Sequence, residues 1–238
     1  MKTLSLKHLL SHFILIVIVA TTGCGPSGDR YFPLDEGRYW RYDMIYETMD
    51  GRFKGIYALE MLETEEKEGR EIYIARTIDG ELIFYTVDEQ GVKRSGSEKT
   101  VDRNTTYSGE ELYVFRYPLK EGTEWESVTV SKALIKTGPP QKTEFHIRAR
   151  VPVSVRIESM HDTVRVPAGT FRNCMRVVLS GDSFINAGNY VGRTIVKVKE
   201  TNWYAPGVGL VKSERNETTT KKALDKGSIT LELAEYRH

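Results

Sequence analysis

Two cysteine thiols are the most reactive side chains of this sequence. Cys24 follows an apolar leader, and Cys174 lies in the apolar run Cys174–Leu179. A cysteine acts as a nucleophile when a nearby histidine or another cation stabilises its thiolate. Free cysteines are otherwise among the most buried side chains of proteins. We therefore interpret Cys174 as a small buried hydrophobic residue, with a nucleophile as the alternative.

The histidines offer little chemistry. Those beyond the leader are His146, His161 and His238, and none of them has the spacing of metal ligands. His161 is followed directly by Asp162, in a predicted turn. We expect surface histidines, no metal site and no cofactor.

A possible catalytic serine lies in Gly181-Asp182-Ser183-Phe184. This motif resembles the nucleophile block of the Gly-Asp-Ser-Leu hydrolases, in which the serine follows a strand and opens a helix of an α/β domain. Here the motif comes late in a β-rich sequence, and only His238 follows it as a potential base. A catalytic triad needs a base within hydrogen-bond reach of the serine. We predict that the protein is not an enzyme, with a hydrolase using Ser183 as the remote alternative.

The first residues have the pattern of a bacterial export signal. Lys2 and Lys7 precede the apolar run Leu9–Ala20, which is too short for a stable membrane span and typical of a cleaved signal peptide. Thr21-Thr22-Gly23-Cys24 resembles the lipobox of bacterial lipoproteins, although leucine is usual at the position of Thr21. The resemblance implies that Cys24 carries a lipid and becomes the new N-terminus, with ordinary secretion as the alternative. Cys174 would then have no intrachain partner, and no disulfide framework is expected.

The chain divides into three parts on this basis. We predict a signal peptide at 1–23, a lipidated N-terminus and tether at 24–31, and a single β domain at 32–238. An extended tether of this length spans about 25 Å. Because Gly25 is not the aspartate that resembles an inner-membrane retention signal, we favour the periplasmic face of the outer membrane.

Composition indicates a β protein without a strong charge. The formal net charge is +1, which gives no reason to expect nucleic acid as a partner. The 13 tyrosines accompany many valines, isoleucines and threonines, which favour strands over helices. A chain of 238 residues can form one all-β domain.

Alternation of apolar and polar residues predicts the strands. It extends from Phe145 to Ile157, which indicates one long strand or two strands bent at Pro152. Further predicted strands include 128–135, 190–204, 208–214 and 229–233, and Asp79-Gly80 predicts a hairpin. Arg94–Glu110 lacks apolar periodicity, so we expect a mobile loop there. No convincing helix is apparent in the mature chain.

One motif occurs twice and organises the chain. Phe32–Trp40 and Tyr117–Trp125 share the pattern aromatic-Pro-Leu-x-Glu-Gly-x-x-Trp. Proline favours an extended residue before it, and glycine allows a tight turn with positive φ. Each copy therefore predicts a corner that begins a run of antiparallel strands, with its tryptophan as a core anchor. We favour one continuous domain with a pseudo-repeat.

Two further motifs support this architecture. Val164–Cys174 contains Val-Pro-Ala-Gly-Thr-Phe, and Trp203–Lys212 contains Trp-Tyr-Ala-Pro-Gly-Val-Gly; both have the composition of turns between strands. Together with Phe32–Trp40 they resemble a signature of uncharacterised secreted and lipid-anchored bacterial envelope proteins. The resemblance implies a single antiparallel, strongly curved sheet, a half-barrel or open barrel, loosely similar to periplasmic lipoprotein carriers. It implies no catalytic residues.

Two functions fit these observations. The first is a non-catalytic envelope lipoprotein whose curved sheet binds an apolar ligand or lipid. Its candidate binding residues are Trp40, Trp125, Trp203 and Tyr204, with the membrane as partner through the lipid on Cys24. The second is a structural or assembly lipoprotein that binds another envelope protein. A concave apolar pocket would favour the first function, and a filled core with an exposed patch or edge strand would favour the second.

Overall fold

The computed structural model describes residues 30–101, 104–138 and 143–238. The predicted signal peptide, Cys24 and Pro139-Pro140 lie outside the described residues, as does the tether before Arg30. Among the residues that are described, no helix is long and apolar enough to cross a membrane.

The described part of the chain contains 15 strands and two short helical turns. In chain order these are β1 (Tyr39–Thr48), β2 (Gly51–Lys67), β3 (Arg70–Thr77), β4 (Leu82–Asp88), β5 (Gly91–Val101), β6 (Asn104–Ser108), β7 (Leu112–Arg116), β8 (Glu124–Val130), β9 (Ile135–Gly138), β10 (Thr143–His146), β11 (Arg150–Val166), β12 (Gly169–Asn186), α1 (Gly188–Val191), β13 (Arg193–Ala205), β14 (Gly209–Thr219), η1 (Lys222–Leu224) and β15 (Lys226–Arg237).

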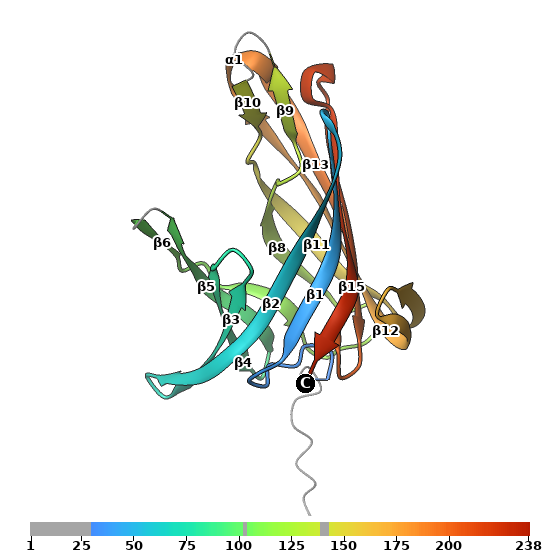
Figure 1. Cartoon of the computed structure of the whole chain (residues 1–238). Helices are drawn as coiled ribbons and strands as arrows, with labels where there is room; N and C mark the ends of the chain where they lie inside the picture. Colours follow the sequence, from blue (N-terminus) through green and yellow to red (C-terminus); the bar gives the residue numbers. More distant parts are fainter. Residues whose placement is uncertain (1–29, 102–103, 139–142) are drawn as a thin grey trace, which may run out of the picture.

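Thirteen of these strands form one antiparallel sheet in the order β6-β5-β4-β3-β2-β1-β15-β14-β13-β12-β11-β8, with β7 paired to β5. β9 and β10 form a separate two-stranded sheet. In Figure 1 the long strands β11 to β15 stand with β1 and β2, while β3 to β6 curve away to the other side. The sheet is thus strongly curved and nearly closed, with one seam between its end strands. This confirms the predicted all-β class and open barrel.

Alternation along β11 shows how the sequence forms this sheet. Val151, Val153, Val155 and Ile157 are buried, and the residues between them are exposed. Because successive side chains of a strand point to opposite faces, the apolar set covers the concave side. The same residues join β12, β13 and the second corner in one hydrophobic core.

Neither of the two predicted alternatives for 145–157, one long strand or two strands bent at Pro152, is correct. The break lies earlier, since β10 ends at His146 and β11 begins at Arg150, with Pro152 inside β11 opposite Val128. The predicted strand 128–135 is also interrupted, because β8 ends at Val130 and β9 begins at Ile135. The two breaks face each other: Ile147 N donates to Leu134 O at 3.0 Å, and Ala149 N donates to Ser131 Oγ at 2.8 Å.

The mobile loop predicted at Arg94–Glu110 is also wrong. This segment contains most of β5 and all of β6, which pair with each other, and β5 also pairs with β4 and β7. The strands of a hairpin pair through backbone hydrogen bonds, which do not require apolar alternation of the side chains. At the buried positions of this segment the small residues Gly96 and Ser97 fill the space. The segment therefore closes one end of the sheet.

The predicted turns agree with the structure better than the predicted strand ends do. Asp79-Gly80 joins β3 to β4, the Val-Pro-Ala-Gly motif joins β11 to β12, and Pro206–Val208 joins β13 to β14. The strand predicted from Tyr190 begins at Arg193, because the single turn α1 precedes it.

The first corner begins β1. Gly37 has φ 79°, its N–H donates to Met61 O at 3.0 Å, and Met61 N donates to Arg38 O at 2.8 Å. Trp40 then pairs with Leu59 of β2. The corner therefore continues directly into the antiparallel pairing of β1 with β2.

The second corner begins β8 with the same bonds. Gly122 has φ 87°, its N–H donates to Ile157 O at 2.9 Å, and Ile157 N donates to Thr123 O at 3.0 Å. Trp125 pairs with Val155 of β11, which lies two residues before Ile157. In the first corner Trp40 pairs with Leu59, which likewise lies two residues before Met61. The sequence repeat is therefore a structural repeat.

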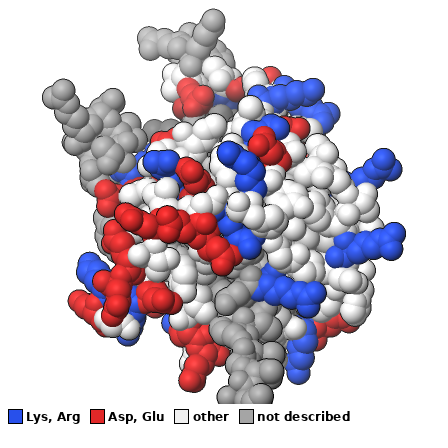
Figure 2. Space-filling model, turned by 60° about the horizontal axis from the view of Figure 1, so that its bottom comes forward, with Lys and Arg blue, Asp and Glu red and all other residues white. Residues whose placement is uncertain are grey.

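Charge is distributed unevenly at the lower end of the molecule. Figure 2 shows acidic side chains gathered on one side of this face and basic side chains on the other. Both signs are present, in agreement with the nearly neutral composition.

Candidate functional site

A hollow of about 330 Å³ opens on the concave side of the sheet. It lies between strands that are distant in the sheet order, β4 and β5 on one side and β13 and β14 on the other, so it is an interior feature of the curved sheet. Its lining consists of aromatic and apolar residues with one charged pair: Phe32, Pro33, Trp40, Tyr42, Tyr57, Leu59, Met61, Tyr85, Arg94, Val114, Glu200, Tyr204, Gly209 and Leu210.

Strand periodicity places most of these side chains. Trp40 and Tyr42 alternate with Arg41 and Asp43 along β1. In β2, Tyr57, Leu59 and Met61 face the hollow, while Ile56 is 51% exposed on the other face. The first corner adds Phe32 and Pro33, so the repeated motif contributes to the wall as well as to the turn.

Aromatic rings bridge the interior beside the hollow. Phe32 makes edge contacts with Tyr85 of β4 at 5.1 Å and with Phe115 of β7 at 5.7 Å, measured between ring centroids. Phe115 continues the series to Tyr204 of β13 at 4.7 Å. Edge-to-face pairs of this kind add stability beyond their buried area. They connect the first corner to both walls of the sheet.

Two lining residues have structural hydrogen bonds. Trp40 Nε1 donates to Val208 O at 2.6 Å, and Tyr42 Oη donates to Leu210 O at 2.9 Å. Both bonds join β1 to the β13–β14 turn and the start of β14. These polar groups are therefore not available to a ligand.

Three other tyrosines have hydroxyls that form no hydrogen bond with any described residue. They are Tyr57, Tyr85 and Tyr204, of which Tyr85 and Tyr204 are 7% and 8% exposed. Burial raises the pKa of all three, that of Tyr85 to about 12, so the phenols remain neutral. The hollow thus presents three neutral groups that can donate or accept hydrogen bonds.

Charged residues mark one end of the hollow. Arg94 Nη2 lies 3.1 Å from Glu81 Oε1, and Glu200 accepts from Arg215 Nη1 at 2.6 Å. Asn202 Nδ2 also donates to Glu200, at 2.8 Å. Both carboxylates at this end are already paired within the protein.

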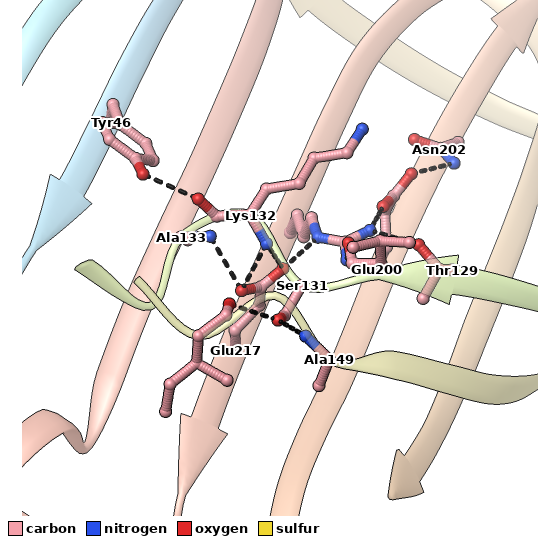
Figure 3. Close-up of polar contacts among 12 residues, drawn as sticks. Tyr46, Thr129, Ser131, Lys132, Ala133, Ala149, Glu200, Asn202 and Glu217 are labelled. Atoms are coloured by element: carbon pink, nitrogen blue, oxygen red, sulfur yellow. Dashed lines mark hydrogen bonds and ion pairs between the residues drawn. The ribbon is translucent and has the colours of Figure 1, made fainter. Parts of the chain in front are cut away.

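The loop 131–134 fills the interior beyond this charged end (Figure 3). Glu217 of β14 is fully buried, and its carboxylate accepts from Lys132 N at 2.9 and 3.0 Å and from Ala133 N at 2.8 Å. Arg215 Nε donates to the same carboxylate at 2.6 Å. Ala133 O lies so close to Gly227 of β15 that a Cβ there would meet it at 1.9 Å. These contacts hold the loop against the sheet.

The four predicted binding aromatics separate in the structure. Trp40 and Tyr204 line the hollow. Trp125 is 5% exposed and packs in the filled core, with Nε1 3.4 Å from Tyr113 O. Trp203 lies on the opposite face of β13 from Tyr204, donates to Asp162 Oδ2 at 3.0 Å and has Lys212 over its ring. The structure does not bring these two tryptophans to the hollow, and a binding role for any of the four stays a prediction.

The sequence analysis missed several residues of this site. Tyr57 and Tyr85 follow the strand period, so alternation could have assigned them to the concave face. The sequence predicts a loop at Arg94 and a strand through Lys132, where the structure has β5 and the break between β8 and β9. No local signal identifies either residue, because their positions depend on strands far away in the sequence.

The candidate catalytic groups have other surroundings. Ser183 lies inside β12, paired with Val196 of β13, rather than at a strand-to-helix turn. Cys174 is fully buried, and burial raises the pKa of its thiol to about 11. Over the described ranges, no cluster of three His, Cys, Asp or Glu side chains could hold a metal ion.

Solved structures resemble this fold at low identity. A candidate exported protein with a YmcC-like fold from Bacteroides fragilis is 16% identical, with a TM-score of 0.42 over 86% of this chain and 97% of the other. A candidate lipoprotein from Parabacteroides distasonis is 15% identical, with a TM-score of 0.39 over 87% and 98%. A candidate outer membrane lipoprotein-sorting protein domain from Vibrio parahaemolyticus is 10% identical, with a TM-score of 0.26 over 85% of each chain.

Sequence comparison gives the family. No curated protein sequence matches this chain significantly. The DUF3108-like family matches residues 36–223, which include the loop 131–134 and every residue that lines the hollow except Phe32 and Pro33. The chain therefore belongs to the DUF3108-like family.

Proposed function

We propose that this protein is a non-catalytic lipoprotein of the bacterial cell envelope that binds an apolar ligand in its interior hollow. The observation that supports ligand binding is the hollow itself, an aromatic-lined space with three hydroxyls that have no hydrogen-bond partner among the described residues. Its volume of about 330 Å³ is at the lower end of the range for small-molecule pockets. An apolar ligand would replace water against these rings and gain free energy by burial.

The anchor is the second part of the proposal. The sequence before the domain supports lipidation at Cys24, with the periplasmic face of the outer membrane favoured. The folded domain begins beside the turn at Gly207, whose N–H donates to Arg30 O at 2.5 Å. The few residues between Cys24 and Arg30 would hold this end of the domain within about 25 Å of the membrane.

The absence of catalysis is part of the same proposal. Ser183 lies in mid-strand, and Cys174 has a thiol that burial keeps protonated. Neither residue lines the hollow. A serine hydrolase would require labelling of Ser183 by a fluorophosphonate probe, and we expect none.

The anchor is tested by Cys24→Ser in the full-length chain. Because the thiol is the lipid acceptor in this proposal, the variant should leave the membrane fraction and appear in the soluble fraction. Mass spectrometry of the parent should find the lipid on the new N-terminal cysteine. An unchanged, detergent-dependent distribution of the variant would contradict the anchor.

The ligand is tested by filling the hollow. Leu59→Trp adds a large ring on the concave face of β2, whereas the control Ile56→Trp adds the same ring on the exposed face of that strand. Lipids that co-purify with each protein from native membranes are identified by mass spectrometry. We expect the parent and Ile56→Trp to retain a bound ligand and Leu59→Trp to lose it. Equal occupancy in both variants, or an empty parent, would rule out this hollow as the binding site.

A further inference from the structure

Lys132 differs from the other cations near the hollow. Its ammonium forms no hydrogen bond or ion pair within the described chain, and in Figure 3 no dashed line joins it to the other residues drawn. Arg94, in contrast, pairs with Glu81, and Arg215 pairs with Glu200 and Glu217. Lys132 is therefore the one cation of this group that lacks a counter-ion.

The backbone of Lys132 is fixed on both sides. Its N–H donates to the Glu217 carboxylate, and its C=O accepts from Tyr46 Oη at 2.7 Å. None of these bonds involves the side chain. The fold thus holds the base of the side chain rigidly and leaves the ammonium free, which is the arrangement expected of a binding group rather than of a structural one.

Lys132 does not itself line the hollow, but its backbone N–H is bonded to Glu217, and Arg215 links Glu217 to Glu200 at the charged end of the hollow. Arg94 and Glu200 both line the hollow, and both act electrostatically on Lys132. The side chain is open to solvent, yet protein surrounds it closely enough that desolvation lowers its pKa, with the positive charge of Arg215 as the second cause. A charge held in such surroundings gains more from an anion than a surface lysine does.

The carboxylates nearby cannot serve as that anion. Glu81 and Glu200 are paired with arginines, and Glu217 accepts four hydrogen bonds from Arg215 and the loop backbone. A cationic ligand would meet Lys132, Arg94 and Arg215 at this end, where the three carboxylates are already bonded to the two arginines and the loop backbone. A neutral apolar ligand would leave the ammonium as it is.

We infer that the ligand of the hollow is an anionic amphiphile, whose carboxylate or phosphate pairs with Lys132 while its apolar part lies among the aromatic rings. The inference rests on the proposed ligand-binding function and names the chemical class of the ligand. Arg94 stands beside the acid group as a second cation, and the hydroxyls of Tyr85 and Tyr204 can donate to it. Charge-assisted bonds of this kind are about twice as strong as neutral ones.

The test compares acid and alcohol with the same chain. Binding of oleate and of oleyl alcohol to the purified full-length protein is measured by calorimetry, for the parent, Lys132→Met, Lys132→Arg and the control Lys54→Met. Lys54 is an exposed lysine of β2 without an ion pair in the described structure. Lys132→Met keeps the backbone bonds to Glu217 and Tyr46, so it should fold.

We expect Lys132→Met to weaken oleate binding about tenfold, which corresponds to one lost charge-assisted contact, and to leave oleyl alcohol unchanged. Lys132→Arg and Lys54→Met should bind oleate like the parent. A lysophosphatidic acid with the same chain separates the sources: tighter binding than oleate indicates a phospholipid headgroup, and weaker binding indicates a free fatty acid.

Two results would overturn the inference in different ways. If the parent binds oleate and oleyl alcohol and Lys132→Met binds each of them as tightly as the parent does, the hollow binds apolar ligands without recognising the charge of the head group. If the parent binds neither probe nor the phosphate, the ligand-binding function itself is wrong.

Discussion

The two corners have the same backbone and different surroundings. In each, a glycine with positive φ donates to a strand residue whose own N–H donates back to the residue after the glycine. Trp40 and Trp125 then occupy equivalent positions and are equally buried, at 5% exposure. Trp40, however, lines the hollow and donates to Val208 O at 2.6 Å, whereas Trp125 packs among filled core residues.

This difference shows what a repeated motif specifies. The nine residues of each copy determine a turn and the direction of the strand that leaves it. What the tryptophan contacts is decided by other segments, the β13–β14 turn for Trp40 and the strands β7 and β11 for Trp125. One motif therefore supports a binding wall in one place and a filled core in the other.

The largest expected effect is the loss of a corner tryptophan. Trp125→Ala leaves a cavity in a filled core and should lower the free energy of unfolding by about 3–5 kcal/mol. Trp40→Ala should cost less, because the space beside it is already open, and should also weaken ligand binding. Urea unfolding and calorimetric binding measure the two quantities. Trp203→Ala, on the outer face of β13, is the control and should cost the least.

Equal destabilisation by Trp40→Ala and Trp125→Ala, with ligand binding intact in both, would mean that the two corners are equivalent core anchors and that Trp40 has no part in the site.

An intermediate effect is expected where the loop 131–134 fills the interior. Glu217→Gln keeps the shape of the side chain and removes the charge that accepts from the loop amides and Arg215. Hydrogen bonds to a charged group are worth about 1.5–3 kcal/mol, so we expect a loss of about 2–3 kcal/mol in thermal or urea unfolding. Glu214→Gln is the control, since its contact with Lys212 lies near the surface and should change stability by less than about 1 kcal/mol.

A loss no larger than that of the Glu214 control would indicate that the loop is held by packing alone. The boundary between the filled and the hollow parts of the interior would then not depend on Glu217.

The smallest effect tests the equivalence of the turns. Gly37→Ala and Gly122→Ala place a Cβ where no atom lies within 4 Å, so only the positive φ opposes it. That conformation costs roughly 1–2 kcal/mol for a residue with a Cβ. We expect equal losses in urea unfolding for the two variants. If the two losses of stability differ by more than about 1 kcal/mol, the corners share their hydrogen bonds but differ in the backbone strain at the glycine.

Some of the candidate site could be read from sequence. Strand periodicity is enough to place Trp40 and Tyr42 on one face of β1, and the predicted strand 190–204 covers most of β13. The sequence did not show that Tyr204 faces the hollow while Trp203 faces outward to Asp162. It also led to a loop where β5 carries Arg94, because the segment lacks apolar periodicity although its backbone pairs with three strands.

The sequence by itself determined the class of fold, the corners and most turns. These depend on strand periodicity and on proline and glycine, whose effects act over a few residues. Only the tertiary structure decided which part of the concave side is filled. The loop 131–134 reaches Glu217 and Gly227 across more than eighty residues of sequence, and Arg94 reaches the hollow because β5 lies across from β13. Contacts between such distant segments depend on how the whole sheet curves, which no local pattern encodes.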